Sequence, residues 1–313
     1  MQNKNRFTKI FSLILKNLLV FALLLTVLEI TLYNLERKKY IEDAKHSGGF
    51  FKAEDTYYGT KTYDFFLDLG FRPTEKYGQK HTILLFGCSF TYGANLKPDE
   101  TFSHILAKIA KSTVYNKACS GWGAQHMLYQ LKQDSFYKEV QNPDYIIYTF
   151  IDDHLNRLNF YQYGGFWGNC VNLRYKEQNG EFVEIKPFLK PLWHFFIVKE
   201  LQQMHERKLN NPLFNTKNVT MFSKMMKESL KLTKQHYPNS KFIFLIYSPC
   251  AREDKNLENM YKDLEKAGFI IMRTDDFVKV NLTDAPYHFG EDCHPTAKAW
   301  EEIAPALAKK LNL

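Results

Sequence analysis

Short runs of consecutive apolar residues recur along the chain beyond residue 80, each bounded by glycine, proline or charged residues. The first, 82–86, reads Thr-Ile-Leu-Leu-Phe and stops at Gly87. Side chains at successive positions of a strand point to opposite faces, so this run predicts a strand that is buried on both faces. The same pattern predicts four further strands, at 113–115, 144–150, 241–247 and 269–272.

Segments with apolar residues at every third or fourth position separate these runs. They lie at 101–110, 125–137, 219–235, 257–267 and 296–311. That spacing predicts helices with one apolar face. Strands that alternate with helices form βαβ units around a parallel sheet covered on both faces. We therefore predict an α/β fold, a three-layer α/β/α sandwich with a five-stranded parallel sheet.

A longer apolar segment, 11–33, precedes this pattern, and its centre carries no charge. About 20 apolar residues in a helix cross the hydrocarbon core of a bilayer. Lys16 and Glu29 lie towards the ends, where long side chains can reach the membrane surface. The segment is N-terminal and apolar nearly all round, which argues against a buried core helix. No small-x-small cleavage motif occurs in 28–33, which favours a retained single-pass anchor over a cleaved signal peptide.

The predicted organisation is a tail (1–10), a transmembrane anchor (11–33), a juxtamembrane linker and strap (34–80), and one domain (81–313). Basic residues flank the anchor almost equally on both sides, so the positive-inside rule barely decides its orientation. These residues are Lys4, Arg6, Lys9 and Lys16 before its uncharged centre, and Arg37, Lys38, Lys39 and Lys45 after it.

An aromatic and glycine-rich insertion, about 159–201, interrupts the alternation of strands and helices. The run Gln-Asn-Gly at 178–180 lies between two apolar stretches and predicts a hairpin turn. The insertion is either a flap near the active site or a surface hairpin. As a flap, it would offer four aromatic side chains to a substrate, Tyr161, Tyr163, Phe166 and Trp167.

The net charge of +8 and the pI near 9.0 do not indicate a nucleic-acid partner, because basic and acidic residues are intermixed. We find no nucleic-acid-binding module, so we expect no nucleic-acid partner. The five cysteines form no Cys-x-x-Cys pair, so no zinc site is expected. If the domain lies outside the cytoplasm, Cys170 and Cys250 could form a disulfide.

Polar and glycine residues follow the first two predicted strands, at the edge where parallel sheets bind ligands. Residues 87–93 read Gly-Cys-Ser-Phe-Thr-Tyr-Gly and place Ser89 in a strand-to-helix turn. Such a turn exposes the hydroxyl and directs backbone amides at developing negative charge. Residues 116–123 read Asn-Lys-Ala-Cys-Ser-Gly-Trp-Gly, and Gly121 can offer its amide to an oxyanion.

Two acids and a histidine, Asp152, Asp153 and His154, follow the third strand. Near the C-terminus, 290–296 reads Gly-Glu-Asp-Cys-His-Pro-Thr, and His294 can act as the general base for Ser89. A divalent metal held by these acids and histidines would leave the serine turn unexplained, so we predict no metal and no cofactor.

Together these four blocks resemble the SGNH (GDSL-like) hydrolase superfamily. Residues 87–91 are similar to its GDSFT block, with Cys88 in place of aspartate. Residues 116–121 resemble the second block, and 292–295 resemble the D-x-H-P form of the last. Residues 69–73 are also similar to membrane-anchored members. The resemblance, over about 66–311, implies a flavodoxin-like α/β/α fold with a Ser-His-Asp mechanism on acyl esters, often on carbohydrate. It also favours a domain outside the cytoplasm.

Two departures from the family pattern stand out. The family's third block has an asparagine that donates to the oxyanion, whereas here Asp152 stands at that position. An ionised carboxylate only accepts hydrogen bonds, so Asp152 must be protonated, turned away or otherwise employed. In the last block, Asp292 fits the shorter variant as the acid that orients His294, and Glu291 is the alternative.

The resemblance implies a membrane-anchored serine esterase acting on an acyl ester, most simply an O-acetyl group on a cell-surface carbohydrate. One alternative is an O-acyltransferase that moves the acyl group to a sugar hydroxyl. Another is a non-catalytic glycan-binding or assembly protein with a degenerate site.

Overall fold

The computed structural model describes residues 12, 14–31, 34–35, 72, 74–158, 173, 175–184, 216–289 and 292–313. Several predicted site residues lie outside this part of the chain. They are Tyr161, Tyr163, Phe166, Trp167, Glu291 and the side chain of Asp292.

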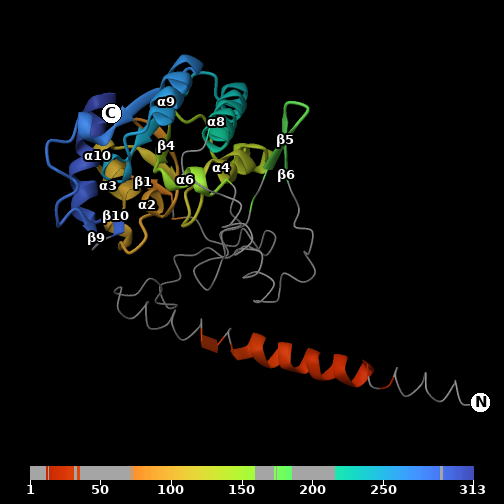
Figure 1. Cartoon of the computed structure of the whole chain (residues 1–313). Coiled ribbons are helices and arrows are strands. Elements are labelled where there is room, and N and C mark those ends of the chain that lie inside the picture. The colour runs from red at the N-terminus through yellow and green to blue at the C-terminus, as the bar shows by residue number, and fades with distance from the viewer. Residues whose placement is uncertain are drawn as a thin grey trace, which may run out of the picture.

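A mostly parallel sheet forms the centre of the domain (Figure 1). Within the described residues it has six strands in the order β1-β3-β2-β4-β7-β8. Five run parallel, as predicted, and β1 pairs antiparallel with β3 at one edge. The strands are β1 (Glu75–Lys76), β2 (Thr82–Phe86), β3 (Thr113–Asn116), β4 (Tyr145–Phe150), β7 (Lys241–Ile246) and β8 (Ile270–Arg273).

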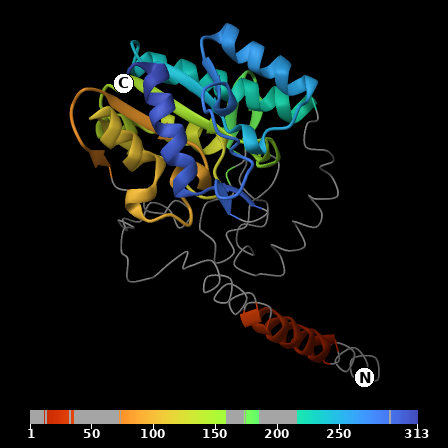
Figure 2. The same ribbon diagram turned by 90° about the vertical axis from the view of Figure 1, so that its left-hand side faces the viewer.

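Helices cover both faces of this sheet, which confirms the three-layer α/β/α prediction (Figure 2). Alternation along β2 shows why: Leu84 and Phe86 enter one core, whereas Ile83 and Leu85 enter the other. The first core is closed by α4 (Ala124–Leu131), α8 (Thr216–His236) and α9 (Lys255–Ala267), and the second by α3 (Phe102–Ala110) and α10 (Ala297–Leu311).

The prediction of a single helix at 125–137 is wrong, because the chain forms two helices there, α4 and α5 (Asp134–Glu139). Gln133 leaves the helical conformation, with φ −98° and ψ 122°, and so separates them. After this break, Phe136 is buried in the core and stacks on Phe86, with 5.8 Å between the ring centroids. Packing in the tertiary structure thus outweighs the continuous helical pattern.

The predicted hairpin is confirmed: β5 (Tyr175–Gln178) and β6 (Glu181–Glu184) pair antiparallel. Asn179 and Gly180 connect them with φ values of 54° and 80°, which asparagine and glycine adopt at the least cost. Tyr175 and Phe182 are buried in the core that α4 and α8 line, so the hairpin is docked on the domain.

The N-terminal helix, Ile14–Thr31, has a mean hydropathy of 2.0, and none of it is buried (Figure 1). A buried core helix is thereby excluded. At 18 residues it is long and apolar enough to cross a membrane, although a signal sequence has the same properties. Within it, the Thr26 and Thr31 hydroxyls donate to the carbonyls of Ala22 and Val27, at 2.9 and 2.8 Å. Polar groups paired in this way are compatible with a hydrocarbon environment.

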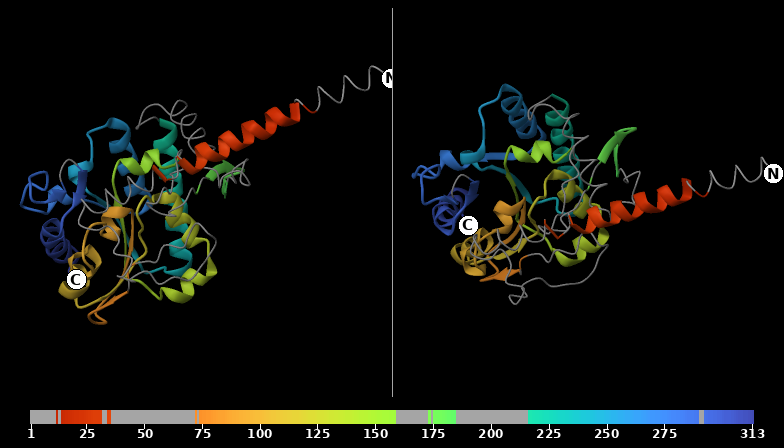
Figure 3. Two further views of the ribbon diagram at one scale, coloured as in Figure 1. Left: turned by 90° about the horizontal axis from the view of Figure 1, so that it is seen from below. Right: turned by 60° about the horizontal axis from the view of Figure 1, so that its bottom comes forward.

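The residues that precede α10 add a feature that the hydrophobic pattern did not reveal. β9 (His288–Phe289) and β10 (Asp292–Pro295) form a two-stranded antiparallel ribbon. Two views of the molecule show this ribbon beside the orange-yellow segment that begins at the end of β2 (Figure 3). The ribbon therefore brings the C-terminal motif to the carboxyl edge of the sheet.

Candidate active site

Ser89 is the first residue of α2 (Ser89–Tyr92), a short helix that begins three residues after β2 ends. Gly87 makes this sharp turn with φ 156°, which falls in the range that favours glycine. A Cβ atom at this position would lie 2.2 Å from Thr91 Oγ1 and 3.3 Å from the Thr149 carbonyl oxygen. The backbone conformation and the close approach of Thr91 therefore both require glycine at position 87, two residues before Ser89.

We predict that Gly87→Ala destabilises the domain by roughly 2–5 kcal/mol, the sum of an unfavourable φ and a buried overlap. Thr91 is β-branched and fully buried, so it has little room to yield. Urea unfolding measures the loss. Gly180→Ala is the matched control, because Gly180 has φ 80° but nothing lies within 4 Å of its added Cβ. Equal losses in the two variants would contradict the role of the Thr91 overlap.

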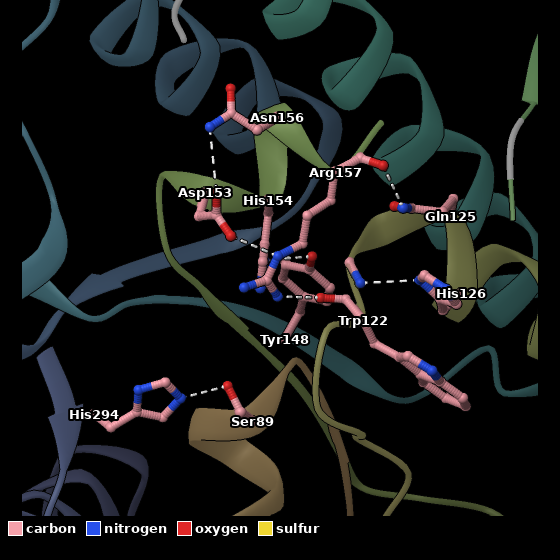
Figure 4. Close-up of polar contacts among 11 residues, drawn as sticks. Ser89, Trp122, Gln125, His126, Tyr148, Asp153, His154, Asn156, Arg157 and His294 are labelled. Carbon is pink, nitrogen blue, oxygen red and sulfur yellow. Dashed lines mark hydrogen bonds and ion pairs between the residues drawn. The ribbon is translucent and has the colours of Figure 1, made fainter. Parts of the chain in front are cut away.

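His294 lies directly against Ser89, although the two are 205 residues apart in sequence (Figure 4). Nε2 of His294 is 2.6 Å from the Ser89 hydroxyl oxygen. The Phe90 ring packs on the imidazole with 4.4 Å between ring centroids, which restricts the orientation of His294. With Nε2 positioned to accept the hydroxyl proton, this pair has the geometry of a nucleophile and its general base.

The segment 116–122 lies beside the turn that carries Ser89. The Asn116 side chain donates to the Thr91 carbonyl in α2 at 2.8 Å, and its own oxygen accepts from the Ala118 amide at 3.2 Å. The amide of Trp122 donates to the Cys119 carbonyl at 3.1 Å and closes a β-turn. Gly121 occupies the third position of that turn with φ 81°, a conformation that favours glycine.

Arg72, from the segment before the first strand, holds the other end of α2. Its guanidinium donates to the carbonyls of Tyr92, Gly93 and Leu96, at 3.0, 2.7 and 3.1 Å. It also lies 4.7 Å above the centre of the Tyr92 ring. A cation at the C-terminal end of a helix pairs the last carbonyls and interacts well with the helix dipole. Arg72 thus stabilises the C-terminal end of α2, the helix that begins at Ser89.

Asp152 bonds to the loop that follows β7. Its Oδ2 accepts from the Arg252 amide at 2.8 Å. Its Oδ1 is buried without a hydrogen-bond partner in the part of the chain that is described. Burial raises the pKa of this carboxyl to about 6, against the opposing effect of the Arg252 amide. Asp152 therefore uses one carboxylate oxygen to bind the loop that follows β7.

We predict that Asp152→Asn stabilises the protein at neutral pH. The folded-state pKa, about 6, lies above the ordinary value of 3.8, so the ionised form is penalised in the folded state. Wild-type stability should therefore fall as pH rises through about 4 to 6, whereas the asparagine variant should not lose this component. The variant should be more stable by about 1–3 kcal/mol at pH 7.5, with the difference vanishing near pH 4.

Denaturant unfolding of both proteins at pH 4 and pH 7.5 measures this difference. Asp263→Asn is a control of opposite sign, because hydrogen bonds from Lys227 and Ser223 lower the pKa of Asp263. That variant should lose stability at neutral pH. A stabilisation by Asp152→Asn that is the same at both pH values would contradict the assignment.

Asp153 and His154 have surroundings quite different from those of Asp152. The Asp153 carboxylate is half-exposed and accepts from Arg157 Nε at 2.7 Å and from Asn156 Nδ2 at 3.2 Å. His154 is fully buried, and its Nδ1 lies 2.8 Å from the Tyr148 hydroxyl (Figure 4). Burial, with smaller effects from Arg157 and His126, lowers the pKa of His154 well below its usual value, so its ring is neutral.

The described acids, histidines and cysteines bear on two further possibilities, a metal site and a disulfide. Among the described residues, no group of three or more histidines, cysteines and acids is placed to hold a metal ion. The described cysteines, Cys88, Cys119, Cys250 and Cys293, form no disulfide with one another. Cys170 lies outside the described residues.

Arg157 is the site residue that sequence reasoning missed. It ends the short helix α6 (Asp153–Asn156) and is almost fully buried. An aspartate four residues before an arginine on a helix is a recognisable pairing signal, but such pairs are common on exposed helix faces. The sequence therefore does not reveal that the arginine of this pair is buried and donates to the Trp122 carbonyl.

Comparisons with known proteins give likenesses of low identity. No family model matches the chain, and no curated protein matches it. The lipase Lip_vut3 from a goat rumen metagenome has a TM-score of 0.47 and 14% identity, over 73% of this chain and 96% of that one. The acetyl xylan esterase Est2A from Butyrivibrio proteoclasticus has a TM-score of 0.44 and 12% identity, over 74% of this chain and 63% of that one.

A third similar structure is a catalytic mutant of Axe2, an acetylxylan esterase from Geobacillus stearothermophilus. Its TM-score is 0.43 at 13% identity, over 76% of this chain and 97% of that one. All three proteins are ester hydrolases by description. These TM-scores are low, so the three similarities carry no argument about the chemistry of this chain.

Proposed function

We propose that this protein is a serine ester hydrolase of the SGNH type. The observation that carries the proposal is the 2.6 Å contact between Ser89 Oγ and His294 Nε2 at the carboxyl edge of a parallel sheet. A serine on a strained strand-to-helix turn, in contact with a histidine from a distant segment, is the arrangement that activates a hydroxyl for acyl transfer.

In this mechanism the Ser89 oxygen attacks the ester carbonyl while His294 Nε2 takes the hydroxyl proton. The carbonyl oxygen becomes an oxyanion, for which the amides of Ser89 and Gly121 are the proposed donors. His294 then returns the proton to the leaving alcohol, and an acyl-serine remains. Water, deprotonated by His294, hydrolyses the acyl-serine and restores the hydroxyl. Asp292, or Glu291 as the alternative, is the proposed partner that orients the imidazole.

The proposed substrate is an acyl ester, most simply an O-acetyl group on a cell-surface carbohydrate. The four sequence blocks support the ester class, and the apolar helix Ile14–Thr31 supports action at a membrane. A domain anchored by one helix acts on what lies near that membrane, which suits a surface polymer. We propose that the domain faces outward from the cytoplasm.

A fluorophosphonate probe applied to the full chain in detergent tests the proposal, followed by mass mapping of the labelled peptide. Labelling of the Ser89 peptide, together with release of acetate from an activated acetyl ester, is the expected result. A protein that neither reacts with the probe nor hydrolyses the ester would be a non-catalytic one, and the proposal would be wrong. Acetylated sugar among the products, when a sugar acceptor is added, would identify transfer in place of hydrolysis.

A further inference from the structure

A buried guanidinium lies between the two turns that form the proposed oxyanion site. Arg157 is only 8% exposed. It comes from the chain that follows β4, whereas the two turns follow β2 and β3. Figure 4 shows its side chain extending from the end of α6 toward the carbonyl of Trp122.

The contacts of Arg157 reach both turns at once. One terminal nitrogen donates to the Trp122 carbonyl at 2.7 Å, directly after Gly121. Its Nε donates to the Asp153 carboxylate at 2.7 Å. The side chain of Cys88, the residue before Ser89, is fully buried and lies near enough to the guanidinium to raise its pKa. A single planar group therefore bonds to the Gly121 turn and lies beside the residue that precedes Ser89.

The backbone of Arg157 is also fixed in place. The Gln125 side chain, at the start of α4, donates to the Arg157 carbonyl at 2.8 Å. The chain therefore closes a loop of contacts: α4 holds Arg157, and Arg157 holds the turn that leads into α4. Reciprocal contacts of this kind restrict how far Arg157 and the Gly121 turn can move relative to each other.

Burial of a guanidinium is costly unless its donors are paired, so the buried Arg157 side chain needs hydrogen-bond and charged partners. Burial acts to lower the pKa of Arg157, but the neighbouring Cys88 and Asp153 outweigh it and raise the pKa. The guanidinium of Arg157 therefore stays charged at neutral pH. Asp153 is half-exposed, so solvent weakens its neutralising effect.

We propose that Arg157 is a positioning residue that sets the distance between the Ser89 turn and the Gly121 turn, so that their amides converge on one oxyanion. The role rests on the proposed esterase function. A lysine could not replace it fully, because an ammonium is a point donor, whereas the guanidinium fork reaches separated acceptors in one plane. Oxyanion stabilisation is needed in the transition state and not in the ground state, so the loss should appear in kcat and not in KM.

The test compares Arg157→Met and Arg157→Lys with the wild-type full chain in detergent, with an activated acetyl ester as substrate. Arg157→Met should lower kcat by about 100-fold with KM changed less than threefold, as for loss of an oxyanion donor. Arg157→Lys should recover part of this loss and fall by about tenfold. Phe242→Leu is the control for a general loss of stability, because Phe242 packs on Phe269 near the opposite end of β7.

Amide hydrogen exchange gives a second measurement that does not depend on activity. In Arg157→Met, exchange should rise together in 88–93 and 119–123, where Tyr92 and Trp122 donate to the carbonyls of Cys88 and Cys119. Exchange in β7 should stay unchanged. Unchanged exchange in both turns, or a kcat loss no greater than that of Phe242→Leu, would overturn the proposal. If the wild type itself is inactive, the esterase proposal fails, and hydrogen exchange still decides whether Arg157 couples the turns.

Discussion

Ser89→Ala is expected to lower kcat for an activated acetyl ester by about 10⁴- to 10⁶-fold, the largest effect of any single substitution considered. Alanine removes the atom that forms the acyl-enzyme, and the residual rate comes from substrate binding and the oxyanion donors alone. Because His294 is the one described side chain that hydrogen-bonds the Ser89 hydroxyl, removal of the hydroxyl should leave the fold intact. Steady-state hydrolysis, with unfolding midpoints for both proteins, measures the two effects separately.

Ser229→Ala is the matched control for this experiment. Ser229 is buried like Ser89, but it lies in the middle of α8, and its hydroxyl has no hydrogen-bond partner within the described part of the chain. Its replacement should leave kcat within twofold of the wild type. A Ser89→Ala variant that hydrolyses the ester at the wild-type rate would refute Ser89 as the nucleophile.

His294→Gln is expected to lower kcat by about 10³- to 10⁵-fold. Glutamine can still hydrogen-bond the Ser89 hydroxyl, but it cannot take up a proton at neutral pH, so the attack loses its general base. Serine and histidine act as one unit, so the double variant with Ser89→Ala should be no slower than Ser89→Ala alone. Labelling by a fluorophosphonate should slow in parallel with hydrolysis.

The control for the histidine is His236→Gln. His236 ends α8 and stacks on Tyr137, with 3.6 Å between ring centroids. Its replacement should leave kcat within twofold. If the losses from Ser89→Ala and His294→Gln multiplied in the double variant, the two residues would act independently, and the proposed pair would be incorrect.

Local patterns of the sequence determined most of the fold. The runs at 82–86 and 241–247 predicted strands buried on both faces, and the structure has β2 and β7 within a residue of those bounds. The hairpin at 178–180 was predictable because Asn-Gly readily adopts the two left-handed conformations of a tight turn. Such features depend on backbone preference and on the period of apolar residues, which a short stretch of sequence carries.

Where the local pattern conflicted with packing, it failed. The apolar spacing at 125–137 continued through Lys132 and Gln133, so a single helix was predicted. In the structure, Gln133 breaks the helix, and Phe136 packs onto Phe86, a residue of β2. A contact between segments that are 50 residues apart has no signature within the helix itself.

The sequence alone also named the two residues of the proposed catalytic pair, through the Gly-Cys-Ser turn and the motif at 290–296. Only the tertiary structure decided that Ser89 and His294 meet, because that contact depends on the register of β10 against β9 and on the docking of α10. It likewise decided that Asp152 bonds to an amide 100 residues away and that Arg157 is buried against the Trp122 carbonyl. The physical reason is that the partner and burial of a polar side chain are set by the segments packed around it, and those segments are remote in the chain.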